Sequence, residues 1–152
     1  MREMKVDAIK DGSVIDHLPP GKALDVIRIL HPAPEASVLL GTNLGSAKMG
    51  AKDIVKIVNY ELSRDELNTL ALLAPDATLT IIRDYKIHQK SGVELPSEVN
   101  GLFGCPNPKC VTNAEPVETR FKLMTGPAHK LKCHYCEKVY MASEVVETEK
   151  HC

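Results

Sequence analysis

Two stretches decide the fold of the last third of this chain: Cys105-Pro106-Asn107-Pro108-Lys109-Cys110 and Cys133-His134-Tyr135-Cys136. The short spacing within each pair lets a tight turn bring both thiolates to the same side of one ion. Two such turns complete the tetrahedron of sulfur ligands that a structural zinc ion prefers. We therefore predict that Cys105, Cys110, Cys133 and Cys136 bind one Zn2+, with no position left for water or substrate.

Other arrangements of these residues are open. The four cysteines could form disulfides in any of three pairings, or hold a redox-active iron ion. His134, His151 or Cys152 could also replace one of the four ligands. Closely spaced pairs in a chain without an apolar export signal favour metal over disulfides, because thiols stay reduced in the cytoplasm. The complete quartet favours zinc held by the four cysteines.

Length and cysteine distribution predict two domains. The chain has 152 residues, 43% of them hydrophobic, which is enough for one ordinary core and a small appendage. The first hundred residues contain no cysteine, so the cysteine-rich part is expected to fold separately and to need its metal. We expect a first domain over residues 1–92, a linker over 93–104 and the zinc domain over 105–152.

The charge balance argues against a nucleic-acid partner. Lys and Arg number 12 against 14 Asp and Glu in residues 1–99, and 7 against 6 in residues 100–152. Aromatic residues make up only 4% of the chain and Trp is absent, so a stacking platform for bases is not expected either. No apolar run reaches the ~18 residues of a membrane span. We expect a cytoplasmic protein that does not contact the membrane.

The first domain shows the periodicities of alternating strands and helices. Ser63 and Glu66 form a capping-box pattern, which predicts that a helix begins after Ser63. Strands are expected over residues 4–9 (resuming over 14–18 after a turn), 37–44, 52–60 and 77–90 (with a bend or two at Arg83-Asp84), and helices over 22–30 and 64–73. This order predicts a ferredoxin-like split βαβ sandwich, in which one antiparallel sheet carries both helices on one face.

The zinc domain is expected to be all-β. Short strands are predicted over residues 117–124, 130–132 and 139–146, clasped as a small antiparallel sheet by the four thiolates. The predicted fold class is therefore α+β, with the sandwich first and a small all-β zinc-binding domain second.

Two polar pairs in the first domain are candidates for chemistry. Asp16 and His17 could be half of a catalytic dyad in a stand-alone enzyme, but no nucleophile motif accompanies them. Lys52 and Lys56 are four apart in a predicted strand, so both are expected on one face, where they could bind a phosphate group. From spacing alone we favour a polar strand end for the first pair and a solvated strand face for the second.

Six segments together resemble the regulatory chain of aspartate carbamoyltransferase. They cover nearly the whole chain and comprise Val6-Asp7-Ala8-Ile9-Lys10, residues 12–17, 49–57 and 72–78, and the two cysteine stretches. The resemblance implies a non-catalytic subunit in pyrimidine biosynthesis, with an allosteric nucleotide-binding domain and a zinc domain. It also implies ATP, CTP and UTP as effectors, with Mg2+ accompanying the bound nucleotides.

The resemblance implies protein partners as well. The first domain is expected to pair with a second regulatory chain as a homodimer, and the zinc domain to dock onto catalytic chains. The usual assembly of the family contains two catalytic trimers and three regulatory dimers. A zinc ribbon that binds nucleic acid is the alternative for the cysteine-rich part, and salt-sensitive binding to DNA or RNA would distinguish it.

Position by position, the resemblance also assigns residues to sites. The residues implied to bind nucleotides are Val6, Asp7, Ala8, Ile9, Lys10, Asp16, His17, Lys52, Lys56, Thr80, Ile82, Tyr85, Ile87 and Lys90. Among them, Lys56 and Lys90 match cations beside the phosphates and the sugar, and Asp16 matches an acidic residue near the ribose. Asn107, Glu137 and Lys138 match residues that contact the catalytic chain. Asp7, Ala51 and Thr80 depart from the family pattern, and each could alter the response to effectors without affecting assembly.

Overall fold

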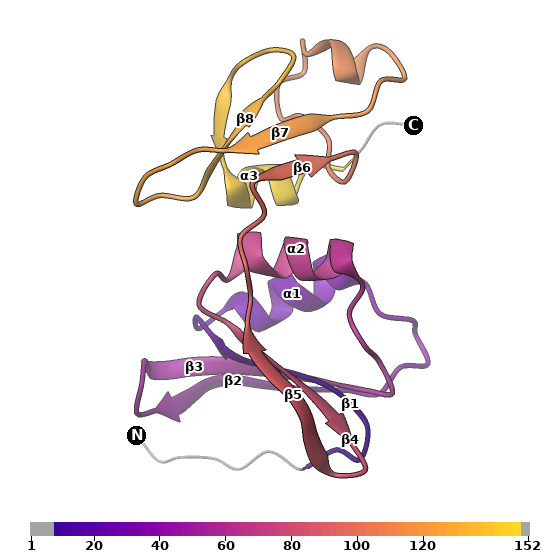
Figure 1. The fold of residues 1–152 in the computed structure, drawn as a ribbon, viewed down its shortest axis with the longest axis vertical. Helices are drawn as coiled ribbons and strands as arrows, with labels where there is room; N and C mark the ends of the chain where they lie inside the picture. Colours follow the sequence, from indigo (N-terminus) through magenta and orange to yellow (C-terminus); the bar gives the residue numbers. More distant parts are fainter. Residues whose placement is uncertain (1–7, 150–152) are drawn as a thin grey trace. The chain divides into compact units, whose positions relative to one another are not determined.

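The structure, a computed structural model, describes residues 8–149 (Figure 1). The chain divides into two compact units, residues 1–94 and 95–152, which we call unit 1 and unit 2. The segment expected as a linker, residues 93–104, is not all linker, because strand β6 (Glu98–Asn100) lies within it and pairs with a strand of unit 2. In the described part of the chain, no helix has both the length and the apolar character needed to cross a membrane.

Unit 1 is one antiparallel sheet with two helices on one of its faces (Figure 1). The strand order is β2-β3-β1-β4-β5, and every neighbouring pair is antiparallel. This is the predicted ferredoxin-like split βαβ sandwich with one extra edge strand, so the predicted fold class is confirmed. The elements of unit 1 are β1 (Gly12–Leu18), α1 (Lys22–Leu30), β2 (Val38–Ser46), β3 (Gly50–Val58), α2 (Arg64–Leu73), β4 (Thr78–Arg83) and β5 (Lys86–Gly92).

The core of unit 1 lies between the sheet and the helices. Ile15 of β1 lies opposite Val55 of β3, and both side chains are completely buried. Val26 of α1 and Leu70 of α2 are completely buried as well. Each such side chain removed from water contributes about 1.5–3 kcal/mol to stability. The apolar side chains that β1 and β3 direct to this side, such as Ile15 and Val55, therefore decide which face of the sheet the helices cover.

The two helices of unit 1 begin in different ways. At α2, Ser63 Oγ accepts a hydrogen bond from the Glu66 N–H at 3.2 Å, and Glu66 Oε1 accepts one from the Ser63 N–H at 2.9 Å. The predicted capping box is thus confirmed. At α1 the N-cap residue is Gly21, with a φ of 92°. A glycine has no side chain to cap a helix, and β3 supplies the cap instead, as described below.

The single strand expected over residues 77–90 is in fact a hairpin, which corrects that prediction. The chain reverses at Asp84 and Tyr85, with φ of 51° and 64°, and β5 returns antiparallel beside β4. Positive φ at both central residues is the geometry of the two-residue turn whose twist matches that of its strands. The glycine that usually marks this turn is missing here, so the sequence indicates only a bend.

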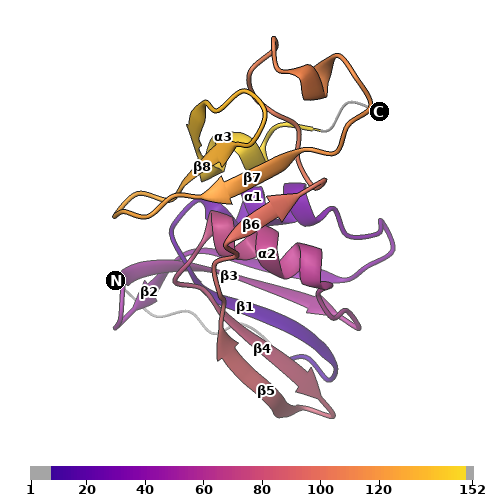
Figure 2. The ribbon, with the colours of Figure 1, turned by 45° about the horizontal axis from the view of Figure 1, so that its top comes forward.

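Unit 2 is a four-stranded antiparallel sheet of order β6-β7-β8-β9 with a short helix, α3, packed against it (Figure 2). The strand expected over residues 139–146 ends at Met141, and the remainder is α3, which corrects that prediction. Ala142, Val145 and Val146 repeat at helical spacing and are all buried. The other elements are the 3-10 helix η1 (Val111–Asn113), β7 (Arg120–Leu123), β8 (Lys130–Cys133), β9 (Val139–Met141) and α3 (Ala142–Val146).

Candidate metal centre and nucleotide-binding face

Unit 2 brings the four predicted metal ligands together. The Sγ atoms of Cys105, Cys110, Cys133 and Cys136 all lie within 4.8 Å of one another. The Cys105–Cys136 and Cys110–Cys133 sulfur pairs are each 3.8 Å apart, much farther than the about 2.05 Å of a disulfide bond. Sulfurs in a tetrahedron around zinc, with Zn–S bonds of about 2.3 Å, are about 3.8 Å apart. The donor set and its spacing therefore fit one tetrahedral ion.

Two neighbouring side chains hold the first cysteine turn. Asn113 Nδ2 donates to the backbone oxygens of Cys105 at 3.0 Å and of Asn107 at 2.7 Å. The Thr112 hydroxyl donates to Cys110 Sγ at 3.2 Å. Neither Thr112 nor Asn113 is among the site residues predicted from the sequence. The sequence does contain a signal for them, since a hydroxyl and an amide side chain follow Cys110 by two and three residues and are close enough to reach the turn.

The thiols affect one another's protonation. Burial raises the pKa of Cys105 and of Cys133, and neighbouring cysteines add to the rise. Burial also opposes ionisation of Cys136, but hydrogen bonds from the Lys138 backbone N–H and from Asn107 outweigh it and lower the pKa of Cys136 to about 7. Cys133 and Cys105 also help to lower the pKa of Cys136, so the cluster holds one readily ionised thiol beside two whose pKa is raised. A divalent cation that binds all four sulfurs would displace the protons of the others.

The residues assigned to the catalytic-chain contact flank the two cysteine turns. Asn107 is only 8% exposed, and its Oδ1 accepts a hydrogen bond from the Lys109 N–H at 3.1 Å. Glu137 and Lys138 are exposed, and Glu137 has a φ of 61° in the second turn. Asn107 therefore stabilises its own turn, whereas the other two side chains are accessible to a partner.

One row of residues crosses the sheet of unit 1 on the face away from the helices. It runs from Lys56 of β3 through Val14 of β1 and Thr80 of β4 to Lys90 of β5. Directly opposed residues share a face of a pleated sheet, and Val14 alternates with Ile15, which is buried under the helices. Two lysines distant in sequence thus lie on one face.

A bulge keeps two residues of β5 on this face. Lys90 lies opposite Thr80, and Ile87 lies opposite Ile82, with a register shift between the two pairs. Thr80 and Ile82 are two apart on β4 and so share a face. Residues three apart, such as Ile87 and Lys90, would face opposite sides of a regular strand, and the extra residue of the bulge brings both to the same side.

A second bulge places Asp16 and His17 side by side. The β1–β3 register shifts between Ile15 and Leu18, and His17 has a φ of 58°. Asp16 lies opposite Thr78, and His17 Nδ1 is 3.0 Å from Thr78 Oγ1. Both side chains therefore reach the same side of the sheet, although neighbours in a regular strand alternate.

Lys52 joins this cluster through an ion pair with Asp16. Its Nζ lies 2.9 Å from Asp16 Oδ1. Burial raises the pKa of Asp16, but Lys52 and the His17 backbone N–H, which donates to Asp16 at 2.6 Å, outweigh burial and hold the pKa below its ordinary value. The term open face is used below for Asp16, His17, Lys52, Lys56, Thr80, Ile82, Ile87 and Lys90. Two of these, Lys56 and Thr80, are themselves buried, at 9% and 8% exposure.

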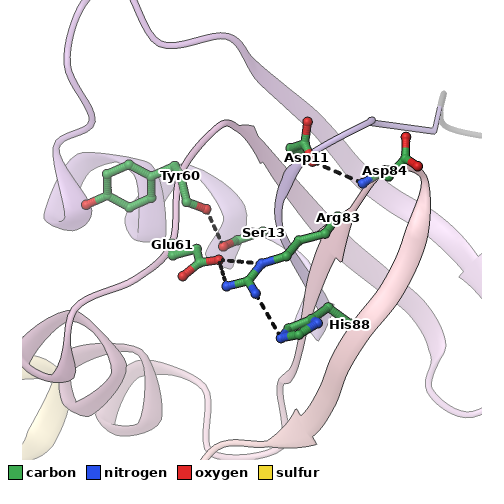
Figure 3. A network of polar contacts seen from close by, with 7 residues as sticks. All are labelled: Asp11, Ser13, Tyr60, Glu61, Arg83, Asp84 and His88. Atoms are coloured by element: carbon green, nitrogen blue, oxygen red, sulfur yellow. Dashed lines mark hydrogen bonds and ion pairs between the residues drawn. The ribbon is translucent and has the colours of Figure 1, made fainter.

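A polar network fixes the β4–β5 turn beside the segment that precedes β1 (Figure 3). Asp11 Oδ1 accepts a hydrogen bond from the Asp84 N–H at 3.0 Å. The Lys10 backbone oxygen accepts one from the Tyr85 N–H at 2.8 Å. Tyr85 is 67% exposed, so its ring is accessible at this end of the sheet. The turn and the segment before β1 are thereby held together.

Arg83 extends the network to the connection between β3 and α2 (Figure 3). Its Nη2 lies 2.7 Å from Glu61 Oε1, and its Nη1 is 3.0 Å from His88 Nε2. The Ser13 hydroxyl donates to the Tyr60 backbone oxygen. These contacts link β1, the β4–β5 hairpin and the residues after β3, which fixes the position of the hairpin and of the open-face residues that it carries.

The remaining predicted residues lie off the open face or outside the described residues. A strand was expected over residues 4–9, but neither Ala8 nor Ile9 is part of a strand in the structure. Ala8 is exposed and Ile9 is buried. Val6 and Asp7, and the rest of that strand before Ala8, lie outside the described residues. The same holds for the alternative ligands at residues 151–152.

Asp53 is a buried carboxylate that is not among the residues predicted from the sequence. It is completely buried, and its Oδ2 accepts hydrogen bonds from the N–H groups of Gly21 at 2.8 Å and Ala23 at 3.1 Å. Its Oδ1 accepts one from the Asn43 N–H at 2.8 Å. Asp53 thus caps α1 from β3 and also holds β2. The signal in the sequence is an acidic residue in the same strand phase as the apolar Val55.

Comparison with known proteins gives the same outline for both units. Residues 4–94 match the family model described as "Aspartate carbamoyltransferase regulatory chain, allosteric domain", and residues 97–146 match "Aspartate carbamoyltransferase regulatory chain, metal binding domain". The chain is 47% identical to the aspartate carbamoyltransferase regulatory chain of Thermococcus gammatolerans, over 96% of this chain and 98% of that one. It is 48% identical to that of Thermococcus onnurineus over the same shares, and 42% identical to that of Tolumonas auensis over 96% of both chains.

Proposed function

The chain belongs to the family of aspartate carbamoyltransferase regulatory chains, and on that premise we propose that unit 1 binds ATP, CTP and UTP on its open face. Unit 2 binds one Zn2+ at its four cysteines and docks onto catalytic chains. The family comprises regulatory chains and not catalytic ones, so Asp16 and His17 serve binding. The observation that carries the proposal is the sheet register, which gathers eight of the expected residues on one face.

Charge and size support the open face as a nucleotide site. Lys56 and Lys90 lie three strand spacings apart, about 14 Å, which suits an extended ligand with a charged end. One lysine binds the phosphates and the other the sugar, whose hydroxyls donate to Asp16. Tyr85 and Ile87 are 67% and 62% exposed, and a base would cover part of that apolar surface. Mg2+ accompanies the phosphates.

The cysteine cluster supports zinc as the resident ion. Four sulfur ligands at tetrahedral spacing suit Zn2+, which is bound by thiolates and in a closed site carries out no redox chemistry. The ion would supply cross-linking of the two cysteine turns. Glu137 and Lys138, accessible beside the second turn, are the residues we expect to touch the catalytic chain, with Asn107 fixing the first turn behind them.

The edge strand β2 supports pairing with a second regulatory chain. β2 lies at one end of the strand order, and its Leu39 and Leu40 are 38% and 43% exposed. The other edge strand, β5, is exposed along its length but mostly polar. An exposed apolar edge strand can pair with a strand of another chain, so proteins normally cover it. In this protein, β2 of a second copy covers β2. Three such dimers would join two catalytic trimers in the cytoplasm.

Regulation then follows from linkage. A nucleotide that binds more tightly to one arrangement of the assembly shifts the whole population toward it. A coupling of about 1–3 kcal/mol changes substrate affinity by a factor of about 5 to 150. The nucleotide acts in this way without contacting any reacting group.

Calorimetric titration of ATP, CTP and UTP into the regulatory chain tests the open face. We expect Lys56→Ala and Lys90→Ala each to weaken binding about tenfold or more, because each removes a charge-assisted contact. Lys86→Ala is the matched control. Lys86 is an exposed lysine of the same strand as Lys90, but it lies opposite Arg83 in the β4–β5 pairing, outside the open face. Wild-type affinity in both open-face variants would exclude this face as the site.

A further inference from the structure

Unit 2 has a charged cleft whose cations the proposed function does not use. It has a volume of about 200 Å³ and lies on the sheet, with Glu98 and Asn100 of β6, Arg120 and Lys122 of β7, and Lys132 of β8 among its lining residues. Most of its lining residues are polar side chains, and the buried Phe121 and Cys133 also contribute to the lining. We call it the β7–β8 cleft.

Three cations in this cleft have no acidic partner among residues 8–149. Lys122 lies directly opposite Lys132, and Arg120 is two residues from Lys122 on the same face. Cross-strand neighbours have Cβ atoms about 5 Å apart, and like charges at that distance destabilise a sheet. Within residues 8–149 none of the three forms an ion pair with a carboxylate. Glu98 lies opposite Lys122 in the β6–β7 pairing, but their side chains do not form an ion pair.

The remaining groups narrow the kind of anion that fits. Glu98 and Glu137 also line the cleft, and two carboxylates would repel the dense charge of a polyphosphate or a nucleic-acid backbone. The carboxylates of a polypeptide are spaced apart, so they can bind the three cations and avoid Glu98 and Glu137. The guanidinium of Arg120 matches a carboxylate in a bidentate geometry.

We propose that the β7–β8 cleft receives an acidic segment of the catalytic chain, whose carboxylates bind Arg120, Lys122 and Lys132. This inference rests on the proposed function, because it takes the catalytic chain as the partner of unit 2. It extends the contact area expected at Glu137, which also lines the cleft. Complementary charge at such a place accelerates association and fixes register.

The test measures the affinity of the full regulatory chain for the catalytic trimer at low and at high salt. We expect Lys122→Glu combined with Lys132→Glu to weaken binding about tenfold or more and to flatten its salt dependence. Lys122→Gln with Lys132→Gln should give a smaller loss in the same direction. Lys130→Glu is the matched control, an exposed lysine of β8 that pairs with Met141 and does not line the cleft. Unchanged zinc content shows that unit 2 stays folded.

The outcomes separate the two proposals. If wild-type chain binds the trimer and the double glutamate variant binds equally well with the same salt dependence, the cleft proposal is wrong and the proposed function stands. An equal loss in Lys130→Glu would overturn it too, because the effect would then be one of net charge. If wild-type chain does not bind the trimer at all, both proposals fail.

Discussion

Asp53 shows how one side chain can organise several elements. Its carboxylate is completely buried and accepts three backbone hydrogen bonds, two at the start of α1 and one from β2. A negative charge at a helix N-terminus is favourable, because the first N–H groups lack partners within the helix. The carboxylate therefore compensates for a helix that begins with Gly21 and so has no capping side chain of its own.

We expect Asp53→Ala to lower the free energy of unfolding of unit 1 by about 3 kcal/mol or more, because three buried N–H groups lose their acceptor. Urea titration followed by circular dichroism measures this loss. Asp53→Asn is the matched variant, since it keeps the shape and one accepting oxygen, and it should cost less. Equal stability of Asp53→Ala and wild type would show that the cap is not needed.

The edge strand β2 makes a prediction about assembly. If Leu39 and Leu40 are buried in a dimer of regulatory chains, replacing both with lysine should weaken the dimer by about 3 kcal/mol or more, a factor of about a hundred or more. Light scattering on the purified regulatory chain would then report monomer at concentrations where the wild type is dimeric.

Gln89→Lys serves as the control, because Gln89 is exposed on β5, the opposite edge of the sheet. A dimer that survives the double lysine change in β2 but not Gln89→Lys would move the interface to β5. Persistence of the dimer in both variants would mean that neither edge forms it.

The division into two units makes a prediction about metal removal. Unit 2 is a short segment whose two cysteine turns would lose their cross-link without an ion. Domains of this size rarely fold without such a staple. We expect a chelator to unfold unit 2 and abolish binding to the catalytic trimer. Unit 1, which has its own core, should stay folded and keep its nucleotide affinity.

Amide hydrogen exchange before and after chelation distinguishes the two units. Loss of protection should be confined to residues 95–149, and added Zn2+ should restore it. Cys133→Ser should behave like the chelated chain, whereas Cys152→Ser should bind zinc and the trimer normally. Full protection of unit 2 in metal-free protein would contradict the structural role of the ion.

Local signals carried much of the fold and part of the site. The capping box at Ser63 and Glu66 involves residues three apart, so it is readable in the sequence and is present in the structure. The cysteine quartet is readable for the same reason, since each pair closes one short turn. The helix α3 was not predicted, because Ala142, Val145 and Val146 suit a strand as well as a helix. Only their burial on one side shows that this segment is a helix.

The sequence determined the order of strands and helices in unit 1 as far as β4, the fold class, and the four cysteines that can hold an ion, because short-range periodicity and spacing encode all of these. The tertiary structure decided which distant residues meet. Lys56 and Lys90 share a face because four strands pair in one register, and Asp16 stands beside His17 because a bulge interrupts that register. A shift of one residue turns every side chain of a strand to the opposite face, so the site exists only once long-range pairing is fixed.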